Sequence, residues 1–104
     1  MEPMNCPVVE RFALSELTFP EVDVLTTPEE KSARRADLHR ATQLGNLSRT
    51  KVRVEFWDAV GCKVLHTTVW ASTAQVVVFK EGMTLPVHRV ARITFPDNHH
   101  SSVV

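Results

Sequence analysis

The second half of this chain consists of short stretches in which apolar and polar residues alternate. Residues 51–57, KVRVEFW, alternate strictly, as a half-buried strand does. Four further strand-like stretches follow at residues 62–72, 74–80, 84–88 and 89–95, separated by turn sequences such as KEGM, whose Gly82 suits a positive φ. Pro86 falls where the fourth stretch must break toward the fifth. A sheet of five such short antiparallel strands protects its edges best by closing into a small barrel.

One helix is expected before these strands. In TTPEEK, Thr27 can cap the helix, Pro28 suits its first position and Glu30 completes a capping box. Gly45 is interpreted as the left-handed residue that stops it, so the helix is predicted over residues 28–44. The expected fold class is mainly β with one helix. One domain spans residues 1–104, with an acidic extended arm (1–26), the helix (27–45), a five-stranded barrel (50–96) and a frayed tail (97–104).

Charge is distributed in blocks, although the net charge of the chain is zero. Residues 1–30 carry seven acidic residues against one arginine, a net charge of −6. Residues 31–53 carry seven basic residues against one aspartate, a net charge of +6. The arm also carries many apolar residues, so it is expected to pack on the domain and, if it folds on the helix, to neutralise the basic block.

The N-terminus suggests a cytoplasmic protein. Glu2 stands where a secretory signal carries positive charge, and no apolar run follows it. No stretch of the chain is long and apolar enough to predict a membrane-spanning helix. In a reducing cytosol Cys6 and Cys62, which match no paired-cysteine spacing, are predicted to remain free thiols. The sequence does not determine whether they have a redox role.

The order of the elements resembles that of the Sm-like fold. A helix, long middle strands and a closing VHRVARI resemble the barrel of the bacterial Sm-like RNA chaperone over residues 28–96, with Gly61 at that family's glycine turn and His88 at its histidine. Val87 replaces the family's lysine, and Ser72 and Thr73 replace its acidic and amide residues. The outline is also similar to a bacterial Rho-inhibitor family, and to an uncharacterised bacterial family on the same barrel. The resemblance implies an Sm-like five-stranded antiparallel small barrel preceded by an α-helix.

Two functions remain open at this point. The first is a protein-interaction or adaptor module, which binds a partner or associates with itself through strand edges or the arm. The second is an RNA-binding module on the basic helix and the first-strand face, with phosphate contacts from basic side chains and base stacking on a tryptophan. Its candidate residues are Arg34, Arg35, Arg40, Arg53, Trp57, His88 and Arg89.

Each candidate also has a structural interpretation. The arginines can pair with acidic residues of the arm, the arm can cover Trp57, and His88 can bond a nearby backbone group. No glycine-rich phosphate loop, nucleophile motif or metal-ligand spacing is present, so no enzyme activity, cofactor, metal or small-molecule substrate is expected.

Overall fold

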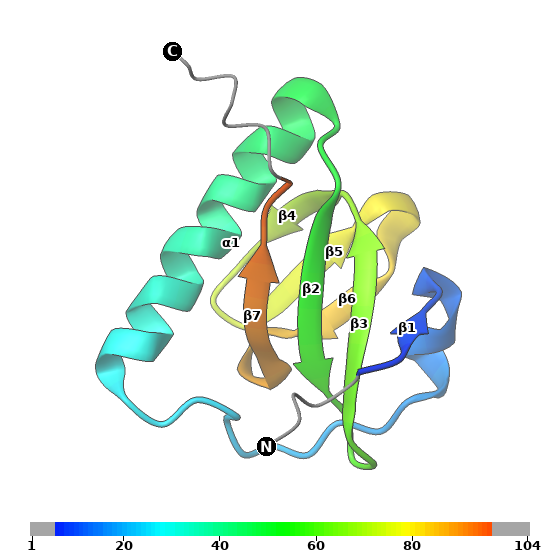
Figure 1. Ribbon diagram of the computed structural model, residues 1–104, viewed down its shortest axis with the longest axis vertical. Coiled ribbons are helices and arrows are strands. Elements are labelled where there is room, and N and C mark those ends of the chain that lie inside the picture. The colour runs from blue at the N-terminus through cyan, green and yellow to red at the C-terminus, as the bar shows by residue number, and fades with distance from the viewer. Residues whose placement is uncertain (1–5, 97–104) are drawn as a thin grey trace.

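The computed structural model describes residues 6–96 and shows two small β-sheets with one long helix beside them (Figure 1). The predicted frayed tail, residues 97–104, and the first five residues of the arm lie outside the described residues. One sheet has the strand order β1-β3-β2-β7 and the other β4-β5-β6. The strands are β1 (Val8–Val9), β2 (Val52–Trp57), β3 (Cys62–Thr67), β4 (Val69–Ser72), β5 (Val76–Phe79), β6 (Thr84–Pro86) and β7 (Val90–Thr94).

Helix α1 (Pro28–Ser48) begins where the sequence predicts and ends later. The capping box is present: Glu30 N donates to Thr27 Oγ1, and Thr27 N donates to the Glu30 carboxylate. Gly45 lies inside the helix, and Arg49, with φ 54°, is the left-handed residue that ends it. The predicted stop at Gly45 was therefore wrong. A Cβ at Gly45 would collide with the carbonyl oxygen of Val69, so this glycine serves the close approach of α1 to β4.

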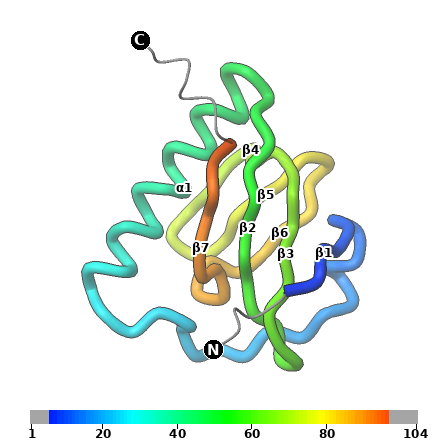
Figure 2. Tube along the Cα trace, in the orientation of Figure 1, coloured from blue at the N-terminus to red at the C-terminus, as the bar shows by residue number. Residues whose placement is uncertain are grey.

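The prediction of a closed five-stranded barrel was wrong. The predicted strand 62–72 is interrupted at Thr68, so that β3 and β4 belong to different sheets, and no ladder of hydrogen bonds joins the two sheets among residues 6–96. Instead of pairing with each other, the edge strands β4 and β7 of the two sheets lie against other elements. Helix α1 packs along β4 and β7, while the arm turns into η1 (Arg11–Glu16), beyond β3 in the tube view (Figure 2). Two further 3₁₀ turns are η2 (Lys80–Gly82) and η3 (Val87–Arg89).

The hydrophobic core lies between the two sheets and under α1. Its largest fully buried side chains include Phe56, Leu65, Phe79 and Leu85. The arm contributes Leu14, which is buried, and several partly buried residues that pack on the same cluster, Val9, Leu17 and Phe19. The expectation that the apolar arm packs on the domain is confirmed.

Cys6 and Cys62 form a disulfide, so the prediction of free thiols was wrong. The reason lies in the pairing of β1 with β3, which is parallel and sets Val8 opposite Val64. Each cysteine stands two residues before one of these partners, and their Cα atoms lie 5.1 Å apart. A two-residue strand has no periodic signal, so this pairing could not be predicted from the sequence.

Candidate functional site

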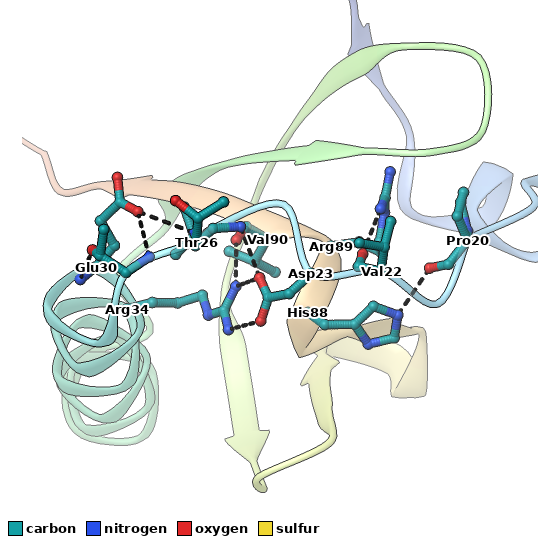
Figure 3. Close-up of polar contacts among 11 residues, drawn as sticks. Pro20, Val22, Asp23, Thr26, Glu30, Arg34, His88, Arg89 and Val90 are labelled. Atoms are coloured by element: carbon teal, nitrogen blue, oxygen red, sulfur yellow. Dashed lines mark hydrogen bonds and ion pairs between the residues drawn. The ribbon is translucent and has the colours of Figure 1, made fainter.

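Arg34, the first of the candidate phosphate ligands, holds the arm. Its guanidinium donates Nη1 to Asp23 Oδ1 (2.9 Å) and Nη2 to Asp23 Oδ2 (2.8 Å), and Nη1 also donates to the carbonyl oxygen of Val90 (3.1 Å), as Figure 3 shows. The Arg34 side chain is only 8% exposed. The hydrogen bonds from Arg34 lower the pKa of Asp23 to about 2. The Arg34 guanidinium is thus engaged by the arm and by the backbone of β7.

His88 and Arg89 hold the preceding residues of the arm in the same way (Figure 3). Arg89 donates Nη1 to the Val22 carbonyl and Nε to the Trp57 carbonyl (2.8 Å), and it is 7% exposed. The His88 ring lies 2.9 Å from the Pro20 carbonyl oxygen. We call this arrangement, in which Arg34, His88 and Arg89 bind residues 20–23, the arm clasp. Arg34 thus pairs with an acidic residue of the arm and His88 contacts a nearby backbone group, whereas Arg89 binds backbone carbonyls instead of acidic residues.

The other four candidate residues do not converge on one place. Arg40 stacks on the ring of Phe95, with 4.3 Å between its Cζ and the ring centroid. Arg53 and Trp57 lie on the outward face of β2, where Arg53 is exposed and Trp57 is half-buried. Arg35 is exposed on α1, on the side that faces β4. The seven candidate residues therefore lie on different parts of the structure.

A groove lies between α1 and the turn that joins β4 to β5. It has a volume of about 420 Å³, within the range of ligand pockets. The helix lines it with Lys31, Arg34, Arg35, Leu38 and His39. Of these, Lys31, Arg35 and His39 are spaced by four residues and therefore share one helix face. Ser72 and Thr73 line it from the strand side. We call it the basic groove.

The charge of the basic groove is left unbalanced. None of its lining residues carries a carboxylate. The ion pairs among residues 6–96 are Arg11 with Glu81, Arg34 with Asp23, and Lys63 with Asp58, so Lys31 and Arg35 have no ion-pair partner in that range. Lys31 contributes to lowering the pKa of Asp23, but the charge of Asp23 is already matched by Arg34. Within residues 6–96, the arm and the helix therefore share one ion pair, at Arg34.

Sequence reasoning missed part of this groove. Lys31 and His39 were not among the candidates, although their spacing of four residues from Arg35 on a predicted helix was a usable signal. Trp70 was also missed: this residue of β4 is 47% exposed, whereas the candidate Trp57 of β2 is half-buried. Its position next to the inward-facing Val69 could have indicated an outward orientation.

No group of three or more His, Cys, Asp or Glu residues lies close enough together to hold a metal ion within residues 6–96. Within the same part of the chain, no helix is long and apolar enough to cross a membrane. The arrangement offers cationic side chains around a groove, and their charge is complementary to that of an anionic ligand.

Comparisons with protein-family models, with curated proteins and with solved structures found no match to this chain. Its function is therefore argued from its own surface, because a fold by itself does not specify one.

Proposed function

We propose that this protein is a small non-enzymatic interaction module that binds an acidic segment of a partner protein in the basic groove. The observation that carries the proposal is the row of Lys31, Arg35 and His39, which are exposed and face a groove lined by no carboxylate. Charge complementarity of this kind selects partners and accelerates their encounter. Leu38 and Val87 also line the groove and offer apolar contact to the stems of glutamate or aspartate side chains.

A protein segment suits this groove better than single-stranded RNA does. Proteins that bind single strands combine a basic track with aromatic side chains on which bases stack. No aromatic residue lines the basic groove. Arg34, His88 and Arg89, which the RNA hypothesis needs for phosphates, are engaged in the arm clasp.

RNA binding remains a second candidate function because of the outward face of the first sheet. Arg53 and Trp57 of β2 share this face with His66, which lies opposite Arg53 on β3, and with Arg92 of β7. Three basic or titratable side chains and one tryptophan are therefore near one another. Glu55 lies among them, opposite Arg92, and its carboxylate would repel a phosphate.

Fluorescence anisotropy of the full-length protein tests the proposal. The probes are a labelled peptide of alternating glutamate and serine and a labelled single-stranded oligouridine, each titrated at several salt concentrations. We expect the peptide to bind, binding to weaken with salt, and Arg35→Glu to reduce affinity about tenfold or more, while Arg53→Glu leaves it unchanged. No peptide binding at low salt, or no effect of Arg35→Glu, overturns the proposal. RNA binding that Arg53→Glu abolishes would support the second candidate.

The cellular location of the module determines the state of its disulfide. The proposed cytoplasmic location requires the Cys6–Cys62 bond to be transient, because the cytosol keeps thiols reduced. Alkylation of the protein in intact cells, followed by mass spectrometry, shows whether the two cysteines are reduced or joined in a disulfide. Alkylated cysteines support the cytoplasm, and an intact disulfide points to an oxidising compartment.

A further inference from the structure

The seam between α1 and β4 continues beyond the basic groove. The hydroxyls of Thr42 and Ser72 lie 3.4 Å apart, and Asn46 Nδ2 donates to the Trp70 carbonyl oxygen at 3.5 Å. Between these contacts Gly45 lies directly against the Val69 carbonyl. The helix and the strand therefore run antiparallel along one continuous seam, from the basic groove to Trp70.

Helix geometry places the seam residues of α1 on one line. Thr42 and Asn46 follow Arg35 by seven and eleven positions, which at 3.6 residues per turn puts all three within about 20° of one direction. The rise over eleven residues is about 16 Å. The backbone of Trp70 thus lies at the far end of the seam, about three helical turns from Arg35.

Trp70 has the properties of an anchor for a partner. It is 47% exposed on β4, although its large aromatic side chain would bury much apolar area in the core. Tryptophan is enriched among the residues that dominate binding energy at protein interfaces. An exposed tryptophan at the end of a seam that begins at a cationic groove provides the two kinds of contact that fix an extended peptide in one register, charge at one end and apolar burial at the other.

We propose that an extended acidic peptide segment of a partner protein lies along the outside of this seam, with carboxylates beside Arg35 in the basic groove and one apolar side chain on Trp70. At about 3.3 Å per residue, a span of about 16 Å separates the carboxylates from the apolar residue by about five positions. This inference rests on the proposed function, because it assumes that the basic groove binds carboxylates, and it adds the second subsite and the spacing between the two.

A set of labelled peptides of about 12 residues tests the spacing against the full-length protein. One peptide carries a glutamate cluster alone among glycine and serine. Two others add a leucine five positions after or five positions before the cluster, and two more place the leucine two positions away. We expect one of the five-position peptides to bind about tenfold more tightly than the glutamate-only peptide, and the two-position peptides to show no such gain.

Variants of Trp70 and Val60 test whether the affinity gained from the leucine depends on Trp70. Trp70→Ser should remove the advantage of the leucine and leave the binding of the glutamate-only peptide unchanged, while Trp70→Phe should retain most of it. Val60→Ser is the matched control, since Val60 is an exposed apolar side chain in the β2–β3 turn. A leucine gain that persists in Trp70→Ser, or no gain at either five-position placement, overturns the inference.

The same titrations separate the two proposals. If the glutamate-only peptide binds in an Arg35-dependent manner but leucine adds nothing, the Trp70 subsite is refuted and the proposed function stands. If no peptide binds at low salt, the proposed function is refuted together with the subsite.

Discussion

The Asp23 carboxylate and the Arg34 guanidinium form a two-pronged ion pair that joins the arm to α1, with nitrogen–oxygen distances of 2.9 and 2.8 Å. Arg34 is almost fully enclosed and Asp23 is about one-fifth exposed. The planar guanidinium matches both carboxylate oxygens at once, which a lysine cannot do. This ion pair gives Arg34, which lies in the most basic part of the sequence, a structural role. The neighbouring Arg35 stays exposed on the surface.

Replacing Arg34 by alanine should destabilise the protein by about 3 kcal/mol, because the Asp23 carboxylate and the Val90 carbonyl both lose their partner. Arg35→Ala, on an exposed neighbouring position, should change stability by no more than about 0.5 kcal/mol. Urea denaturation of both variants measures the difference. Equal effects of the two substitutions would contradict the structural assignment of Arg34.

The stability of the protein should decrease at acidic pH in part because Asp23 becomes protonated. Its pKa is lowered from 3.8 to about 2 in the folded state, so folding favours the charged carboxylate. The resulting stabilisation is complete above about pH 4 and is lost as the pH falls toward 2. Asp23→Asn should flatten this part of the melting-temperature profile. The slope that remains belongs to other carboxyls with lowered pKa values, Glu30, Asp58 and Glu81.

Gly45→Ala should destabilise the protein, although alanine favours helices more than glycine does. The added Cβ would overlap the Val69 carbonyl oxygen, and neither backbone can move without separating α1 from β4. The expected loss is about 1–3 kcal/mol by thermal or urea unfolding. Gly61→Ala is the control, because a Cβ there meets open space. A stabilised Gly45→Ala variant would show that the helix does not approach β4 this closely.

Removal of the disulfide by Cys6→Ser should cost about 4 kcal/mol, the loop-closure contribution expected for a sequence separation of 56 residues. Urea unfolding with and without a reducing agent measures it, and reduced wild type should match the variant. Hydrogen exchange at the Val64 amide, which donates to the Pro7 carbonyl, reports whether β1 leaves the sheet. Unchanged stability after reduction would mean that the arm is held by its other contacts alone.

Local features of this fold were predictable because their causes lie within a few residues. The capping box at Thr27 and Glu30 set the start of α1, and the alternation of residues 52–57 identified β2 with its outward Arg53 and Trp57. The β5–β6 turn has the positive φ at Gly82 that its sequence predicts, together with one at Glu81. Each of these depends on backbone dihedrals or on side-chain periodicity, and neither requires knowledge of distant contacts.

Tertiary structure decided what each charge and each cysteine does. Arg34 and Arg35 are adjacent in sequence, yet the helix turns one toward the arm and the other toward the β4–β5 turn. Cys6 and Cys62 pair only because a two-residue strand adds to β3 in parallel. The two sheets do not close into a barrel, and α1 packs along β7 and β4, one edge strand of each sheet. The sequence determined the individual elements, and contacts between residues tens of positions apart determined which surfaces remain open for binding.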